Sequence, residues 1–241
     1  MTARLSTAPR VLTALPLAID PDEVLRFQGY QKSVDTPGAE VLALFDDALA
    51  LGRGLITPRA VVRWLAVTRQ GADTIDAGGV TLTIPDVGRL WGPVEWVAAA
   101  VCTIGDGLER RVGELWEARE LPLAAMLDSV GSGAVESLAE YVNDVFCQEA
   151  IPLGLPVTNR VSPGYGRWDV AQQRRLFDVC PGDAIGVSLN EACFMTPVKS
   201  ISLIAAAGAG AKVDHYFSQC ARCWMPDCAY RRKPARTTVH G

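Results

Sequence analysis

The chain has 241 residues, of which 49% are apolar, and its formal net charge is −4. An apolar content of this size is enough to form the core of one domain. The charge is weak, and no basic stripe runs through the chain, which argues against binding to a nucleic-acid backbone. No stretch of about 18 uncharged apolar residues occurs, so we expect no membrane-spanning helix.

The start of the chain, Met1 to Leu17, is mainly apolar, with Arg4 and Arg10 interspersed. Arg10 interrupts what would otherwise be the apolar core of an export signal. We therefore predict that residues 1–20 form a flexible leader and that the protein is cytoplasmic.

Helical and strand-like patterns follow one another from Asp22 onward. A helix is predicted between Pro37 and Gly52, because apolar residues recur there at helical spacing. The alternation at 80–84 is typical of a half-buried strand. Further strands are predicted at 61–67, 95–101, 156–161, 185–189 and 198–206, and further helices at 108–120, 122–145 and 170–179. The strands are spaced too irregularly for repeated strand–helix–strand units, which favours an α+β fold with a mainly antiparallel sheet.

Small residues interrupt the long helix predicted at 122–145, in the run Gly131-Ser132-Gly133-Ala134. Each glycine inside a helix costs about 1 kcal/mol relative to alanine. We therefore expect the backbone of another segment, or a ligand, to approach the helix closely at this point.

The most informative stretch is 160–168, which reads Arg-Val-Ser-Pro-Gly-Tyr-Gly-Arg-Trp. Pro163-Gly164 favours a tight turn whose backbone groups can contact a ligand directly. Arg160 supplies a planar cation that suits a carboxylate, and Tyr165 supplies an aromatic face for a sulfonium or a purine. An ordinary surface turn with exposed aromatic residues is the alternative interpretation.

Several downstream motifs extend this pattern. They are Leu176-Phe177, Gly186-Val187-Ser188-Leu189 and Met195-Thr196-Pro197-Val198-Lys199-Ser200. Together with Arg160-x-x-Pro-Gly-Tyr, they resemble the activation domain of cobalamin-dependent methionine synthase. Stand-alone relatives of that domain are more similar still, since they share the element Arg26-Phe27-Gln28-Gly29-Tyr30 and the element Thr103-Ile104-Gly105.

The resemblance implies a curved α+β domain, here residues 21–206, with a twisted, mainly antiparallel sheet flanked by helices. It implies that S-adenosylmethionine binds at the turn, with Arg160 on the methionine carboxylate. The residues that would line this site are Arg160, Ser162, Pro163, Gly164 and Tyr165.

The function implied by the resemblance is reductive reactivation of a cobalamin-dependent methyltransferase. One electron from a reductase and a methyl group from S-adenosylmethionine would restore methylcobalamin. The Asp-x-His-x-x-Gly signature for the lower cobalt ligand is absent from the sequence. We therefore expect the cobalamin on a partner corrinoid protein or methyltransferase. A non-catalytic docking or scaffold protein for such a partner is the alternative.

Seven cysteines are present, and three of them cluster in the C-terminal tail, residues 207–241. Cys220, Cys223 and Cys228 have a spacing that is typical of a metal site, either an iron–sulfur cluster or zinc. Cys180, Cys193 and His215 are candidates for a fourth ligand. An electron-transfer role for such a tail, or thiols without any metal, are further possibilities. The cysteines at 102, 147, 180 and 193 lie in apolar surroundings and are predicted to be buried.

Overall fold

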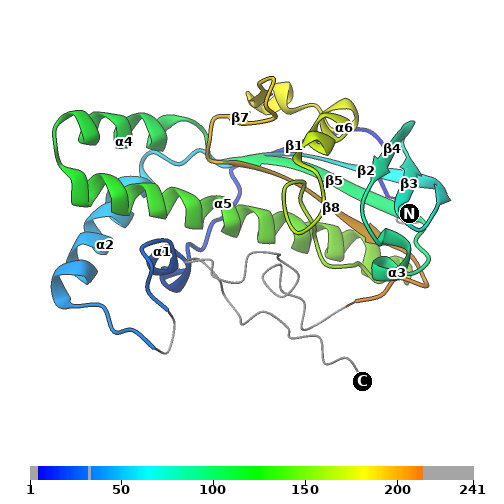
Figure 1. Ribbon diagram of the computed structural model, residues 1–241, viewed down its shortest axis with the longest axis horizontal. Coiled ribbons are helices and arrows are strands. Elements are labelled where there is room, and N and C mark those ends of the chain that lie inside the picture. Colours follow the sequence, from blue (N-terminus) through cyan, green and yellow to red (C-terminus); the bar gives the residue numbers. More distant parts are fainter. Residues whose placement is uncertain (1–4, 32–33, 214–241) are drawn as a thin grey trace.

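A computed structural model describes residues 5–31 and 34–213 (Figure 1). Six strands form one sheet in which every pairing is antiparallel, in the order β4-β3-β2-β5-β8, with β1 beside β2. The strands are β1 (Arg10–Thr13), β2 (Arg59–Gln70), β3 (Thr74–Ala77), β4 (Val80–Thr83), β5 (Trp96–Thr103) and β8 (Ser200–Ala207). A separate hairpin consists of β6 (Ser188–Leu189) and β7 (Met195–Thr196). The predicted α+β class with an antiparallel sheet is confirmed.

Helices cover both faces of the sheet. The long helix α5 (Leu121–Ala150) runs along one face, and α1 (Pro21–Phe27), α2 (Ala39–Arg53) and α4 (Gly107–Glu117) pack against it (Figure 1). The other face is covered by α3 (Val87–Trp91), α6 (Gln173–Val179) and the short turn η3 (Gly182–Ile185). Two more short turns, η1 (Ile151–Leu153) and η2 (Val170–Gln172), follow α5 and precede α6.

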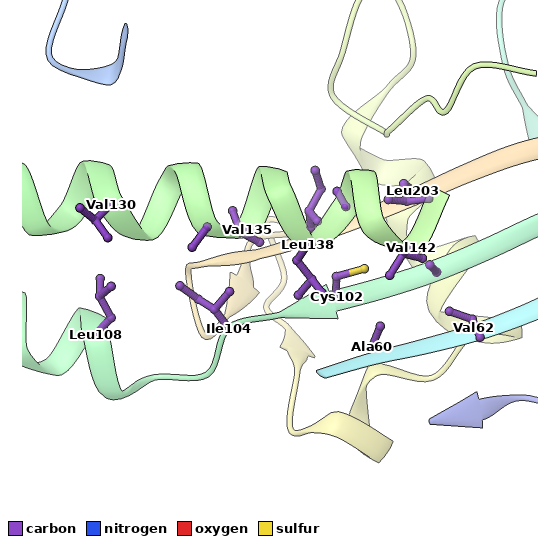
Figure 2. Close-up of a cluster of buried hydrophobic side chains, with 14 of the residues drawn as sticks. Ala60, Val62, Cys102, Ile104, Leu108, Val130, Val135, Leu138, Val142 and Leu203 are labelled. Atoms are coloured by element: carbon purple, nitrogen blue, oxygen red, sulfur yellow. The ribbon is translucent and has the colours of Figure 1, made fainter. Parts of the chain in front are cut away.

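The central strands are apolar on both faces because each face packs against helices. On β5, the side chains of Ala98, Ala100 and Cys102 join the core beneath α5, whereas Val97 and Val101 join the opposite core. Successive side chains of a strand point to opposite faces, so this division follows directly from the strand period. Figure 2 shows the α5 side of this packing, with Val135, Leu138 and Val142 directed toward the strands.

The glycines of α5 let neighbouring side chains approach the helix axis. A Cβ atom on Gly131 would lie 2.7 Å from Leu108 Cδ2, and one on Gly133 would lie 2.8 Å from Val24 Cγ2. Between the two glycines, Ser132 Oγ accepts a 2.9 Å hydrogen bond from Lys199 Nζ. The close approach is therefore made by side chains of α1, of α4 and of Lys199 just before β8, and not by a backbone segment as expected.

The prediction of a flexible leader is wrong for part of residues 1–20. Residues 10–13 form β1 and pair with the first residues of β2, and Leu5 is buried. In addition, the Trp64 backbone N–H donates to Ser6 O at 3.1 Å. The segment is stabilised by long-range pairing with β2, which the local sequence pattern does not show.

Two predicted strands are less regular than expected. Residues 156–161 pair with β8 only through single bridges, Val157 with Ala207 and Val161 with Ile204. The run at 185–189 divides into the end of η3 and the two-residue strand β6, with Gly186 in a left-handed conformation between them. In the described part of the chain, no helix is long and apolar enough to cross a membrane.

Candidate functional site

The segment that leads to the Pro-Gly-Tyr turn is fixed to the free edge of β8. Thr158 N–H donates to Ala206 O at 2.8 Å, and the Thr158 hydroxyl accepts from Ala206 N–H at 3.0 Å. Val161 and Ile204 exchange two backbone hydrogen bonds of 2.8 and 2.9 Å. These bonds hold the backbone on both sides of Arg160 in a defined position.

The turn itself closes through three backbone hydrogen bonds. Tyr165 N–H donates to Ser162 O, Trp168 N–H donates to Tyr165 O, and Gly164 N–H donates to Trp168 O at 2.9 Å. Gly164 has a φ of 88°, which L-residues with a side chain rarely adopt. The predicted tight turn is therefore present, and glycine is required at 164 by its backbone conformation.

Two buried polar atoms of the turn have no hydrogen-bond partner among the described residues. They are Ser162 Oγ and Trp168 Nε1, and their residues are 3% and 5% exposed. Leaving a buried donor or acceptor unsatisfied costs about 1–3 kcal/mol. A bound molecule or an ordered water that satisfies these atoms would remove that cost.

Arg160 makes two ion pairs with α5. Its Nη2 lies 2.8 Å from Glu136 Oε2 and 2.7 Å from Glu140 Oε1, and its Nε donates to the same Glu140 oxygen at 3.1 Å. Burial alone would lower the pKa of Arg160, but the negative charges of Glu136 and Glu140 outweigh burial and hold this pKa above its ordinary value. Arg160 is thus a permanently charged group on the flank of α5.

A groove of about 570 Å³ lies along the same face of α5. We call it the acidic groove, because five carboxylates line it. Its lining residues are Pro16, Ala18, Asp20, Glu23, Glu136, Ser137, Glu140, Tyr141 and Asp144. The α5 members recur at helical spacing, which places Glu136, Glu140 and Asp144 on one face of the helix. Such a concentration of negative charge suits a cationic ligand.

The predicted site residues are divided between the groove and its surroundings. Arg160 meets the groove through two of its lining residues, Glu136 and Glu140. Ser162, Pro163, Gly164 and Tyr165 follow directly in the adjoining turn, but they are not among the described residues that line the groove. Tyr165 is 47% exposed.

The carboxylates of the acidic groove were not predicted from the sequence. The signal that could have revealed them is the recurrence of Glu136, Glu140 and Asp144 at every fourth position of a predicted helix. Acidic residues at this spacing repel one another unless a cation or a ligand compensates them.

The remaining motifs of the resemblance have structural contacts. Gln28 follows α1 and donates to Ser129 Oγ at 2.6 Å, which ties that helix to α5. Gln173 is buried, accepts from Ser202 Oγ and donates to Cys193 O. Lys199 forms a 2.8 Å ion pair with Asp128. These contacts join the end of α1 and the residue before β8 to α5, and they join α6 to β8.

The cysteine site predicted at Cys220, Cys223 and Cys228 lies outside the described residues, as does His215. Within residues 5–31 and 34–213, no group of three His, Cys, Asp or Glu side chains is arranged to hold a metal ion. Cys102, Cys180 and Cys193 are buried as predicted, whereas Cys147 is only partly buried. Burial raises the pKa of the Cys180 thiol to about 12.

Comparison with known proteins supports the architecture. No family model matches the chain, and no curated protein sequence matches it. Among solved structures, the crystal structure of the MetH reactivation domain bound to AdoHcy superposes with a TM-score of 0.66. The match covers 89% of this chain and 82% of that chain, at 16% sequence identity.

This chain has the fold of the MetH reactivation domain. The resemblance expected from the sequence motifs is thereby confirmed at the level of the fold. At this sequence identity, the superposition establishes the architecture alone.

Proposed function

We propose that this protein binds S-adenosylmethionine at the junction of the acidic groove and the Arg160–Trp168 segment, and that it serves the reductive reactivation of a corrinoid protein. The observation that carries the proposal is the juxtaposition of opposite charges at this junction. S-adenosylmethionine carries a sulfonium, an ammonium and a carboxylate. The groove offers carboxylates for the cationic groups, and Arg160 offers a guanidinium for the anionic one.

The turn provides groups for the rest of the ligand. The Ser162 hydroxyl, which is unsatisfied among the described residues, is a candidate hydrogen-bond partner for the ligand, and Tyr165, a residue that is 47% exposed, offers an aromatic face for the purine. The solved neighbour of the same fold is bound to AdoHcy, the demethylated form of this ligand.

Methyl transfer from S-adenosylmethionine to cobalt requires that the protein position the methyl donor, more than it requires an acid or a base from the protein. S-adenosylmethionine supplies the methyl group, and cob(I)alamin on the partner supplies the electron pair that forms the new cobalt–carbon bond. The sulfur–carbon bond breaks toward sulfur, leaving S-adenosylhomocysteine. One electron from a reductase first converts cob(II)alamin to cob(I)alamin. The role of this chain is to hold the methyl donor in line with the cobalt of a cytoplasmic partner.

Calorimetric titration of S-adenosylmethionine into the full-length chain tests the proposal. We expect saturable one-to-one binding that weakens at least tenfold in Arg160→Ala, because a bidentate charged pair contributes about 1.5–3 kcal/mol. Arg69→Ala is the matched control, since Arg69 pairs with Asp76 on the β2–β3 ribbon. No binding by the folded wild-type protein at millimolar ligand would refute the proposal.

Two other functions stay open to experiment. A scaffold that only docks on a corrinoid protein would bind that partner without binding S-adenosylmethionine. An electron-transfer protein would carry iron and sulfide at Cys220, Cys223 and Cys228, and metal analysis of anaerobically purified chain, beside a variant with all three cysteines changed to serine, distinguishes iron–sulfur, zinc and no metal.

A further inference from the structure

We propose that Glu140 is an exchangeable counterion of Arg160, which the carboxylate of the incoming ligand replaces, while Glu136 stays in place. The proposal rests on the function proposed above and adds a residue that regulates the affinity of the same site. It follows from the way in which the two carboxylates differ in their contacts and in their exposure.

Glu140 occupies one donor edge of the guanidinium. A single oxygen, Oε1, accepts from both Nε at 3.1 Å and Nη2 at 2.7 Å. A free carboxylate pairs with arginine through two parallel hydrogen bonds to such an edge. Glu140 therefore occupies a position that a ligand carboxylate would need for bidentate binding.

The two glutamates differ in how readily they can leave. The Glu136 side chain is 18% exposed and the Arg160 side chain 13%, whereas the Glu140 side chain is 61% exposed. Glu140 can turn into solvent without moving the backbone of α5 and without desolvation of its charge. The pair is exposed on the Glu140 side only, and the ligand carboxylate replaces the charge that leaves, so this exchange has a small net cost.

The charge balance around Arg160 favours replacement of Glu140 by the ligand carboxylate over binding of a third carboxylate. Arg160 already has two carboxylates within 2.8 Å of its nitrogens. A third carboxylate would add repulsion around a single positive charge, whereas replacing Glu140 keeps the local charge unchanged. Glu136, which remains, holds the guanidinium in place for the ligand.

The consequence is competition between Glu140 and the ligand carboxylate for Arg160. Removal of Glu140 should therefore tighten the binding of a ligand that carries a carboxylate. General electrostatics predicts the opposite, because S-adenosylmethionine has a net positive charge and Glu140 is a negative charge in the groove. The sign of the effect separates the two explanations.

The test compares three variants with the wild-type chain, and two ligands, by calorimetry. In Glu140→Ala we expect S-adenosylmethionine to bind about two- to fivefold more tightly, the range set by the loss of an ion pair in which one partner is exposed. We expect no change for 5′-methylthioadenosine, which lacks the carboxylate.

Asp144→Ala is the matched control: Asp144 lines the same groove one turn farther along α5, and within the described residues it makes no ion pair with Arg160. This control should not tighten binding. Glu140→Gln, which keeps the size of the side chain, should shift in the same direction as Glu140→Ala.

Three results would overturn the inference. If S-adenosylmethionine binds the wild-type chain and Glu140→Ala binds it equally or more weakly, Glu140 is not a competitor, and the proposed function stands. If Glu140→Ala tightens both ligands equally, the carboxylate is not the group that exchanges. If neither wild type nor variant binds S-adenosylmethionine, the proposed function fails together with the inference.

Discussion

At the residue scale, Arg160 shows how far the sequence could predict the site. The Pro-Gly-Tyr motif drew attention to Arg160 as a ligand group, but its partners Glu136 and Glu140 lie 24 and 20 residues away in the chain. Local patterns do not reveal such long-range ion pairs. The sequence therefore predicted the cation but missed the carboxylates that surround it.

Gly133 illustrates a residue whose role is steric. A Cβ atom there would lie 2.8 Å from Cγ2 of the fully buried Val24, so we expect Gly133→Ala to destabilise the fold by about 1–2 kcal/mol. Gly113 in α4 is the control, because no atom lies within 4 Å of a Cβ built there. Gly113→Ala should stabilise by up to about 1 kcal/mol. Urea unfolding measures both variants, and equal stabilisation by the two would contradict the packing described for α1 and α5.

Cys180 provides a prediction about thiol reactivity at the same scale. Its thiol is buried beneath the sheet, and burial raises its pKa to about 12, so at pH 8 the thiol is protonated in the folded protein. Alkylation requires the thiolate. We expect iodoacetamide to leave Cys180 unmodified at pH 8 until urea unfolds the chain, as measured by peptide mass mapping. Modification of Cys180 in the native protein, at the rate seen in urea, would show that this thiol is accessible.

At the element scale, apolar periodicity predicted the long helices and the central strands, because their patterns are local. It located α2, α5 and β5 within a few residues. It missed β1, since a four-residue strand is stabilised by its partner β2 rather than by its own sequence. The segment 156–161 was predicted as a strand, yet it pairs with β8 only at single positions.

This edge segment depends on Thr158. Its hydroxyl accepts from the buried Ala206 N–H at 3.0 Å, so Thr158→Val, of similar shape, leaves that N–H unsatisfied. We expect a loss of about 1–3 kcal/mol of stability in urea unfolding. Thr158→Ser keeps the hydroxyl and should retain most of the stability. A valine variant as stable as wild type would mean that the segment next to Arg160 is not anchored in this way.

At the scale of the whole molecule, the sheet and α5 position the two parts of the candidate site. One end of the charged junction is Arg160, on the segment attached to β8, and the other is the carboxylate face of α5. The sequence predicted this architecture through its motifs, and the superposition on the MetH reactivation domain confirms the fold. The acidic groove was not predicted from the sequence. One wall of the groove comes from Pro16, Ala18, Asp20 and Glu23, and the first three of these lie in the segment that was predicted to be a flexible leader.

Hydrogen-exchange mass spectrometry of the full-length chain, with and without S-adenosylmethionine, tests most directly whether this junction is the binding site. We predict slower exchange in two groups of peptides, those covering 156–168 and those covering the α5 residues 133–145. Peptides of the β6–β7 hairpin serve as the internal reference and should not change. Protection confined to other parts of the chain, or none at saturating ligand, would contradict the assignment of the site to Arg160 and the acidic groove.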